Sequence, residues 1–360
     1  MGSQHVLVTG GAGYIGSHTA KALAAAGYVP VVLDDLSTGN EWAVQWGPFV
    51  RGDIANTSLV HRTVERFEIK AAIHLAASAC VAESMRDPSK YFRNNVAHSL
   101  SFLNALVACD VSRLVFSSSC AVYGIPQADV LDEDHPQVPV NPYGESKLFV
   151  EKACQWYEAA YNLRYVCLRY FNAAGADSSG ELGESHVPET HVIPLIIGTS
   201  LGLYPEFTVN GTDLPTPDGT AVRDYVHVSD VAAAHVSALE YLQAGGPSER
   251  LNLGTGNGVS VRKIIQTVER LSGESIPTRE GHRRPGDPPV LIASHKRAEH
   301  VLGWKPAYTD LHSIISTARN WSVSQLEGRF ESGLVGLANS VDDLTPEEPH
   351  GHAAFPRLLR

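Results

Sequence analysis

A glycine-rich turn between an apolar strand pattern and a helical pattern is the feature that most limits how this chain folds. Gly10, Gly13 and Gly16 follow the apolar run at residues 5–9 and open the helical pattern at residues 14–26. Glycines allow a tight turn and let a pyrophosphate approach the backbone, and the start of a helix favours negative charge. The spacing therefore predicts a strand–turn–helix unit that binds a dinucleotide.

An acidic residue at the end of the next apolar run indicates which dinucleotide binds. Asp34 follows the run at residues 29–33 and stands 18 residues after Gly16. A carboxylate at this place accepts hydrogen bonds from both hydroxyl groups of a ribose. The next arginine along the chain is Arg51, so nothing close by would bind a 2′-phosphate. We therefore expect NAD rather than NADP.

Apolar runs and helical patterns alternate through the first 172 residues. Such alternation is typical of a parallel sheet that helices cover on both faces. We predict an α/β fold in which a Rossmann-type doubly wound parallel sheet forms an NAD-binding domain over residues 1–172. The predicted strands are 5–9, 29–33, 49–50, 71–77, 113–119 and 164–170, and the predicted helices are 14–26, 58–67, 93–109 and 146–161.

The pattern changes after residue 172. Glycine, serine and acidic residues are frequent over 173–190, and shorter strand and helix patterns follow. We predict a smaller mixed α/β domain over residues 173–325, which is free to interleave with the first domain. Polar composition makes 326–360 an expected flexible tail. The predicted helices of this half are 191–201, 230–244, 261–272, 295–302 and 311–322.

Charge and composition exclude several classes of protein. A formal net charge of −11 argues against a nucleic-acid-binding surface. We find no signal peptide and no apolar run long enough to cross a membrane. The five cysteines form no Cys-x-x-Cys pair, which is typical of reduced thiols in a cytoplasmic protein. The 16 histidines include no pair with zinc-protease spacing, so no metal site is predicted.

A tyrosine and a lysine four residues apart supply acid–base chemistry to this nucleotide site. Tyr143 and Lys147 share one face at the start of a predicted helix, and Ser119 ends a predicted strand. Lowering the tyrosine pKa from about 10 to about 7 needs roughly 4 kcal/mol, which the lysine ammonium and a positive nicotinamide are expected to supply. The alternative is an ordinary surface pair, but its position after the glycine turn favours catalysis.

Four further residues have a structural as well as a functional interpretation. Asp53 either bonds an adenine or closes a turn, and Asn94 either contacts the cofactor or caps a helix. Arg223 and Arg284 each suit bidentate binding of a diphosphate, or else form surface ion pairs. These alternatives stay open on the residues alone.

An ordered set of motifs over residues 5–322 resembles the extended short-chain dehydrogenase/reductase superfamily, and within it the UDP-glucose 4-epimerases. The Tyr-x-x-x-Lys pair indicates only the superfamily, whereas the ordered set is highly specific. The motifs are TGGAGYIGS at 9–17, NNV at 94–96, SSSCAVYG at 117–124, NPYGESK at 141–147, RYFN at 169–172, DGTAVRDYVH at 218–227 and RRPGD at 283–287.

The resemblance implies interconversion of UDP-galactose and UDP-glucose with a tightly held NAD. Tyr143 takes the proton from the sugar 4-hydroxyl while hydride leaves C4 for the nicotinamide. The 4-keto sugar then rotates and receives the hydride on its opposite face. Ser119 helps to hold the 4-oxygen, and Lys147 binds the nicotinamide ribose and tunes Tyr143.

The resemblance also implies that the domain over residues 173–325 binds the nucleotide sugar, and that the chain is a homodimer through the helices near 93–109 and 146–161. It further implies which residues of this chain contact each ligand. The expected NAD contacts are Gly10, Gly13, Tyr14, Ile15, Gly16, Asp34, Asp53, Ile54, Leu75, Ala76, Ala77, Asn94, Tyr143, Lys147 and Tyr170. The expected UDP-sugar contacts are Ser119, Tyr143, Phe171, Asn172, His191, Val192, Thr208, Val209, Asn210, Arg223, Arg284, Asp287 and Leu291.

Three positions depart from the epimerase pattern. Ala79 stands where many epimerases have a lysine that reaches the cofactor, and His191 stands where an asparagine is frequent. Leu291 occupies a pocket-wall position at which a bulky tyrosine tends to exclude N-acetylated sugars. Because leucine is intermediate in size, a UDP-GlcNAc/GalNAc 4-epimerase stays open as an alternative, and so does a UDP-pentose 4-epimerase.

Two functions of other kinds are less well supported. A nucleotide-sugar 4,6-dehydratase needs an additional acid after the serine, typically within an Asp-Glu pair, but Cys120 and Ala121 stand there. A non-catalytic NAD-sensing protein on the same fold need not retain Tyr143, Lys147 and Ser119, and this chain has all three. The sequence therefore favours the epimerase.

Overall fold

The computed structural model describes residues 4–283 and 288–338, with side chains described as far as residue 327. The predicted substrate contacts Arg284 and Asp287 lie outside these residues. Contacts within the chain separate a large unit that ends at Ser322 from a second unit that begins at Val323.

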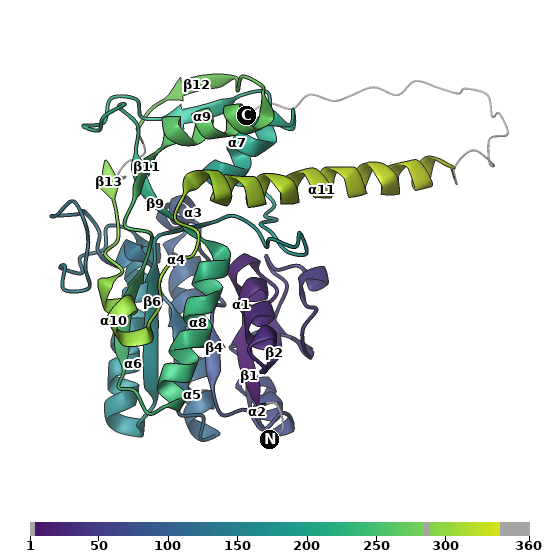
Figure 1. Cartoon of the computed structure of the whole chain (residues 1–360). Coiled ribbons are helices and arrows are strands. Elements are labelled where there is room, and N and C mark those ends of the chain that lie inside the picture. Colours follow the sequence, from purple (N-terminus) through teal and green to yellow (C-terminus); the bar gives the residue numbers. More distant parts are fainter. Residues whose placement is uncertain (1–3, 284–287, 339–360) are drawn as a thin grey trace, which may run out of the picture. The chain divides into compact units, whose positions relative to one another are not determined.

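Seven parallel strands form the central sheet in the order β10-β6-β5-β4-β1-β2-β3 (Figure 1). The order reverses between β1 and β4, and ligands bind at such a reversal, outside the carboxyl ends of the strands. This arrangement confirms the predicted Rossmann-type doubly wound sheet. The strands are β1 His5–Thr9, β2 Val29–Asp34, β3 Phe49–Arg51, β4 Ala72–His74, β5 Arg113–Ser117, β6 Arg164–Tyr170 and β10 Glu249–Leu253.

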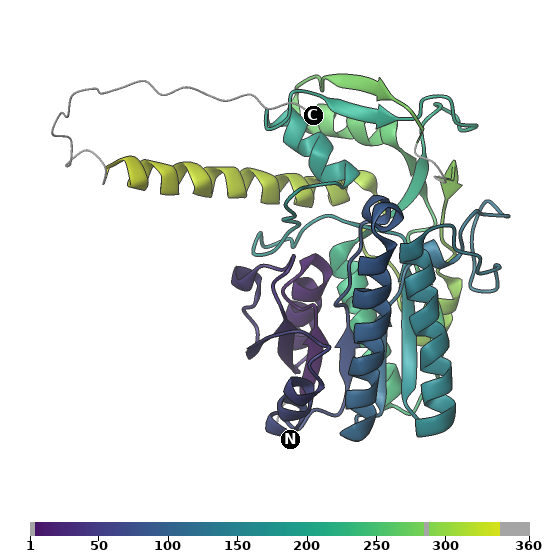
Figure 2. The same ribbon diagram turned by 180° about the vertical axis from the view of Figure 1, so that it is seen from behind.

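Helices cover both faces of this sheet, as the two opposite views show (Figures 1 and 2). Successive residues of a strand point to opposite faces, so Leu7 belongs to one apolar core and Val8 to the other. Within the described residues, none of the helices is both long and apolar enough to cross a membrane. One face carries α2 Thr57–Arg66, α5 His98–Ala108 and α6 Pro142–Tyr161, and the other carries α1 Tyr14–Ala25, α8 Val228–Gln243 and α10 Lys296–Leu302.

Shorter strands build a smaller mixed region with a third apolar core. Because α8 and β10 return to the central sheet between these elements, the chain passes between the two regions more than once. The domain bounds at 172 and 325 stay predictions. The strands are β7 Asn172–Ala174, β8 Phe207–Asn210, β9 Val222–His227, β11 Gly258–Ser260, β12 Thr278–Gly281 and β13 Val290–Leu291, and the helices are α7 Val192–Ser200, α9 Val261–Ser272 and α11 Leu311–Ala338.

Two helical segments differ from the sequence pattern. The helix predicted over 311–322 continues to Ala338, because no proline interrupts the chain before Pro346. Residues 326–338 are therefore helical where a flexible tail was predicted. The pattern at 93–109 begins earlier, since α3 Val81–Arg86, α4 Pro88–Tyr91 and a π-helical segment at Phe92–Ala97 precede α5. Asn94 consequently lies inside helical structure and does not cap it.

Four histidines that are buried in the neutral form predict how stability depends on pH. Burial lowers the pKa of His74 to about 3 and the pKa values of His18, His227 and His235 to about 4. An unfolded chain titrates its histidines near 6.5, so it binds more protons than the folded chain between about pH 4 and 6.5. We expect the free energy of unfolding to fall as the pH falls through this window, by up to about 1.4 kcal/mol per pH unit for each histidine.

Denaturant unfolding at about pH 7.5, 6 and 5 measures this dependence. The variant His235→Leu is expected to flatten it, because one buried group that must stay neutral is removed. His300→Leu alters an exposed histidine and serves as the control. An equal pH dependence in the wild-type chain and in His235→Leu would contradict the prediction.

Candidate active site

The glycine turn joins β1 to α1 at the carboxyl end of the sheet. Gly10 has a φ of +71°, a conformation that favours glycine, and a Cβ on Gly16 would lie 2.0 Å from the carbonyl oxygen of Gly10. Gly13 caps α1 and supplies no side chain to satisfy the first N–H groups of the helix. These N–H groups and the positive helix end suit the pyrophosphate of a dinucleotide.

Asp34 lies at the end of β2 beside this turn and is 8% exposed. Its Oδ2 accepts a hydrogen bond from the N–H of Ala12 at 3.0 Å, and its Oδ1 accepts one from the N–H of Leu36 at 2.9 Å. Burial raises the pKa of the carboxyl, and the two hydrogen bonds oppose that rise. Because a carboxylate has about four lone-pair sites, both oxygens keep capacity for ribose hydroxyls.

The segment after β4 lines the part of the site at which the cofactor is predicted to bind, which we call the cofactor side. Leu75, Ala76 and Ala77 are half-buried there. A Cβ on Gly10 would come within 2.5 Å of the Ala76 nitrogen, so the two backbone segments pack directly. Ala79, which stands where the epimerase pattern has a lysine, is exposed. The three predicted contacts are therefore brought beside the glycine turn.

Asn94 and Asn95 hold the loop that follows this wall. Nδ2 of Asn94 donates to Ser78 Oγ at 3.1 Å. The buried Asn95 accepts from the N–H of Ser78 at 2.8 Å and donates to its carbonyl at 2.9 Å. The sequence motif pointed to this pair, but only the structure shows that Asn95 bonds the loop backbone.

Asp53 and Ile54 lie at the outer end of the cofactor side. Oδ1 of Asp53 accepts the N–H of Ala55 at 2.8 Å and lies 3.4 Å from His98 Nδ1. Ile54 packs into the core between the sheet and α2. The turn role of Asp53 is therefore present, and its contact with adenine stays a prediction.

Tyr143 and Lys147 lie on one buried face at the start of α6. Asn141 caps this helix, because its side chain accepts a backbone N–H at 2.8 Å. Nζ of Lys147 donates to the carbonyl of Ser117 at 2.7 Å and lies 5.9 Å from the centre of the Tyr143 ring. The hydroxyl of Ser119 is near enough to Tyr143 to lower the pKa of the phenol. The structure thus brings the three predicted catalytic residues together.

Burial governs the protonation of the tyrosine and the lysine. It raises the pKa of Tyr143 well above its usual value, and the interaction with Ser119 opposes that rise. It lowers the pKa of Lys147 to about 7. The lysine alone therefore does not lower the tyrosine pKa as expected, and the fall that base catalysis needs depends on the second predicted source, a positive nicotinamide.

A buried ion pair that the sequence did not predict supports this group. Glu151 and Arg169 form a bidentate pair, with Nε to Oε1 at 2.9 Å and Nη2 to Oε2 at 2.5 Å. Oε1 of Glu151 also accepts from Ser118 Oγ at 2.5 Å, so the pair anchors the segment that carries Ser119. Helix spacing could have placed Glu151 near this group, because Glu151 follows Lys147 by four residues on the same helix face.

The end of β6 and the residues after it connect the cofactor side to the part of the site at which the substrate is predicted to bind. The hydroxyl of Tyr170 is hydrogen bonded to Ser117 Oγ, and burial raises its pKa to about 12. Phe171 is buried in an apolar cluster against which Leu291 packs. Asn172 begins β7, which pairs with β9. The predicted pocket wall at Leu291 is therefore close to a predicted substrate residue.

Arg223 and Leu291 are partners in the register of β9 and β13. Nη1 of Arg223 donates to the carbonyl of Val222 at 2.7 Å. The neighbouring Asp224 was not singled out from the sequence, yet its buried carboxylate ties three segments together. It accepts backbone N–H groups from Thr255, Gly256 and Ala293 at 2.8 to 3.1 Å.

The other predicted substrate residues belong to the smaller region. His191 precedes α7 and its Nδ1 lies 2.7 Å from Glu184 Oε1, while Val192 begins the helix. Burial lowers the pKa of His191, but Glu184 and Glu189 outweigh it and raise the pKa overall. β8 holds Thr208, Val209 and Asn210 and pairs with β12.

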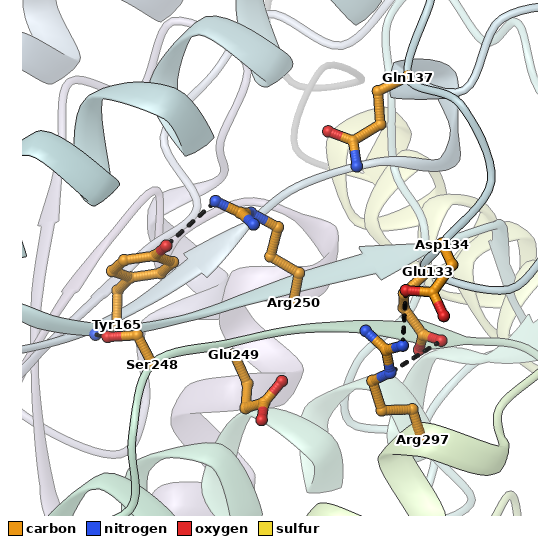
Figure 3. A pocket seen from close by; sticks show the side chains of 8 residues that line it. All are labelled: Glu133, Asp134, Gln137, Tyr165, Ser248, Glu249, Arg250 and Arg297. Carbon is orange, nitrogen blue, oxygen red and sulfur yellow. Dashed lines mark hydrogen bonds and ion pairs between the residues drawn. The ribbon is translucent and has the colours of Figure 1, made fainter.

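A pocket of about 370 Å³ at the edge of the sheet, beside β10, is separate from this group (Figure 3). Charged side chains line it, but none of the predicted catalytic residues does. Figure 3 shows Arg297 paired with Glu133 and Asp134. Arg250 donates to the hydroxyl of Tyr165 at 3.1 Å. We therefore do not assign catalysis to this pocket.

Known proteins resemble the chain over most of its length. A UDP-glucose 4-epimerase of Rhizobium meliloti is 47% identical over 328 residues, which cover 91% of this chain and 100% of the relative. A crystal structure of UDP-glucose 4-epimerase from Brucella ovis in complex with NAD is 51% identical, with a TM-score of 0.86, and covers 88% of this chain and 98% of that chain.

A second crystal structure, of a UDP-glucose 4-epimerase from Stenotrophomonas maltophila with bound NAD and formylated UDP-arabinopyranose, is 38% identical. Its TM-score is 0.87, and it covers 90% of this chain and 99% of that chain. Residues 6–254 match the model of the NAD dependent epimerase/dehydratase family. With this match and these identities, the chain belongs to the NAD-dependent epimerase/dehydratase family, within the extended short-chain dehydrogenase/reductase superfamily.

Proposed function

We propose that the chain is a UDP-glucose 4-epimerase, an isomerase that interconverts UDP-galactose and UDP-glucose with NAD. The observation that carries the proposal is that the buried side chains of Ser119, Tyr143 and Lys147 lie together at the carboxyl end of the sheet, where the glycine turn also lies. Burying a phenol and an ammonium is costly, and such perturbed groups are typical of active sites. A protein that only binds NAD does not need them.

The chain's own residues move one proton and hold one oxygen. NAD supplies the hydride acceptor and donor when bound. Tyr143 takes the proton of the sugar 4-hydroxyl and returns it when the 4-keto group is reduced. The hydroxyl of Ser119 holds the 4-oxygen of the sugar. Lys147 binds the nicotinamide ribose, and its positive charge favours the tyrosinate.

We assign the UDP part of the substrate to the smaller region. Asn172 and Arg223 supply polar groups beside the sugar pocket, and His191 supplies one at the start of α7. The strand β8 with Thr208, Val209 and Asn210 is assigned to the uracil. A firm hold on UDP leaves the 4-keto sugar free to turn between the two hydride transfers.

Incubation of the purified chain with UDP-galactose, without added NAD, tests the proposal. UDP-glucose is expected to form, because the cofactor is expected to travel with the protein. If UDP-glucose forms only after NAD is added, the activity holds and tight retention of NAD fails. If neither condition gives UDP-glucose, the epimerase proposal fails for this substrate.

Two sugar classes compete with galactose for the same site. Leu291 packs against the cluster around Phe171, so the sugar pocket has an aliphatic wall of intermediate size. The Stenotrophomonas structure holds formylated UDP-arabinopyranose, which makes pentoses a second class to examine. Parallel assays with UDP-GalNAc and a UDP-pentose, compared by kcat/KM with UDP-galactose, decide between them.

We further propose a homodimer through α5 and α6 and a cytoplasmic location. Phe149 and Trp156 are seven residues apart on one face of α6, and their side chains are 50% and 75% exposed. Asn104 is exposed on the neighbouring α5, which packs beside α6 (Figure 2). Two exposed aromatic side chains beside a polar residue suit an interface with a second copy of the same helix pair. All five cysteines are free thiols, as in reducing compartments.

The variant Trp156→Glu is expected to turn the dimer into a monomer, because a buried unpaired carboxylate at the interface is costly. Light scattering coupled to size-exclusion chromatography measures the mass. Leu203→Glu places the same charge at a comparably exposed apolar residue outside α5 and α6, and it is expected to remain dimeric. A Trp156→Glu variant that stays dimeric would refute this interface.

A further inference from the structure

Four side chains with metal-binding atoms converge in the segment between β7 and α7. They are Glu184, His186, Glu189 and His191, and one ligand atom of each lies within 4.8 Å of the other three. All four come from eight consecutive residues, so the local fold of this segment alone brings them together. Helical histidine spacing does not predict this cluster, because the four residues lie in a loop.

The distances within the cluster are close to those of a small coordination shell. His191 Nδ1 lies 2.7 Å from Glu184 Oε1 and 3.0 Å from Glu189 Oε1. His186 Nδ1 lies 3.2 Å from Glu184 Oε1 and 3.9 Å from Glu189 Oε2. Zinc bonds of about 2.0–2.1 Å in a tetrahedral shell separate neighbouring ligand atoms by about 3.3 Å. Small side-chain shifts would therefore admit an ion.

Hydrogen bonding within the protein does not satisfy the whole cluster. The side chains of Glu184 and Glu189 are only 8% and 10% exposed, so their charges need a partner. His191 donates to Glu189 at 3.0 Å, which an ion pair explains. Nδ1 of His186, however, is buried and makes no hydrogen bond, although a carboxylate oxygen lies 3.2 Å away. A cation bound between this nitrogen and the two carboxylates would satisfy all three groups.

We propose that Glu184, His186, Glu189 and His191 bind one divalent transition-metal ion, with Zn²⁺ as the reference ion. Two imidazole nitrogens and two carboxylates are a donor set that suits Zn²⁺. Mg²⁺ and Ca²⁺ prefer oxygen ligands throughout. The two carboxylate charges balance the ion, so both histidines bind in the neutral form.

The place of the cluster indicates a structural role for the ion. The ring of His186 packs edge-on against Tyr14 of the glycine turn, with centroids 6.4 Å apart. The carbonyl of Glu184 accepts the indole N–H of Trp321 at 3.0 Å. His191 immediately precedes α7, to which we assign UDP binding. An ion here fixes the segment that runs from the cofactor side to the substrate side, without contact with the reacting atoms.

Metal titration of the full-length chain tests the site without reference to turnover. Protein without a histidine tag is treated with a chelator, dialysed, and titrated with Zn²⁺ by calorimetry. One ion is expected to bind per chain and to raise the melting temperature. Co²⁺ in its place is expected to give the strong visible absorption of a tetrahedral ion. Absence of binding, or several weak equivalents without a rise in melting temperature, would overturn the proposal.

Two ligand variants and one matched control separate this site from scattered surface histidines. His186→Ala and Glu189→Gln are each expected to weaken Zn²⁺ binding at least about tenfold. His300→Ala removes an exposed histidine on α10 and is expected to bind as the wild type does. Circular dichroism and bound NAD confirm that each variant is folded. Equal Zn²⁺ affinity in the folded His186→Ala variant would overturn the assignment, and epimerase activity has no bearing on that result.

Discussion

Replacing Tyr143 by phenylalanine is expected to lower kcat for the conversion of UDP-galactose by about 10³-fold, the usual scale for loss of a general acid–base group. Tyr143 is 8% exposed and lies near Ser119, so removing its oxygen takes away the proposed proton acceptor and leaves the ring in place. NAD is expected to stay bound, because Asp34, Lys147 and the glycine turn are unchanged. Steady-state kinetics and the NAD content of the purified variant measure both.

Tyr161→Phe is the matched control for this prediction. Tyr161 ends the same helix and its side chain is 59% exposed, so loss of its hydroxyl is expected to leave kcat unchanged. If Tyr143→Phe retained wild-type turnover with NAD bound, the proton would have to pass through another group. The catalytic role of Tyr143 would then be wrong.

Replacing Arg169 by methionine is expected to lower the free energy of unfolding by about 3–5 kcal/mol, because it leaves the buried carboxylate of Glu151 without its bidentate partner and with the longer contact to Arg250 at 3.4 Å. Arg169 is fully buried, and its guanidinium makes two hydrogen bonds to Glu151 and one to the hydroxyl of Tyr123. Denaturant unfolding measures the change. Activity is expected to fall as well, because Glu151 also holds Ser118, the neighbour of Ser119, for which we propose a catalytic role.

An exposed ion pair provides the control for this prediction. Arg279 and Glu206 lie 2.8 Å apart with 65% and 42% of their side chains exposed, so Arg279→Met is expected to cost less than about 1 kcal/mol. The double variant Glu151→Gln with Arg169→Met removes both charges of the bidentate pair, and only Arg250, whose side chain is 25% exposed, loses its contact with the Glu151 carboxylate. It is expected to recover part of the stability that Arg169→Met loses. A loss below about 1 kcal/mol in Arg169→Met would contradict the role of the pair.

The parts of the fold that the sequence predicted are those set by neighbouring residues. The glycine turn, the strand before it and the helix after it depend on a run of about twenty residues, and the structure forms them at the expected bounds. Tyr143 and Lys147 were predictable for the same reason, because a helix fixes their spacing. The motif order then indicated the family, which the comparisons establish.

The parts that the sequence did not predict depend on contacts between distant residues. Nothing local in Arg169 shows that it pairs with Glu151, or that Asp224 accepts N–H groups from the loop at Thr255. The return of β10 to the edge of the central sheet is likewise a non-local pairing with β6. The pKa of Lys147 depends on burial, which the helical spacing does not report.

Transfer of deuterium from C4 tests the central claim, that the chain removes a hydride from C4 of the sugar and returns it to the same carbon. UDP-galactose labelled with deuterium at C4 is converted in ordinary water, and the UDP-glucose formed is analysed by NMR. The proposed chemistry predicts deuterium retained at C4, because the hydride does not exchange with solvent while NAD holds it. UDP-glucose with hydrogen at C4 would mean that C4 loses its hydrogen as a proton, and it would contradict the proposed mechanism.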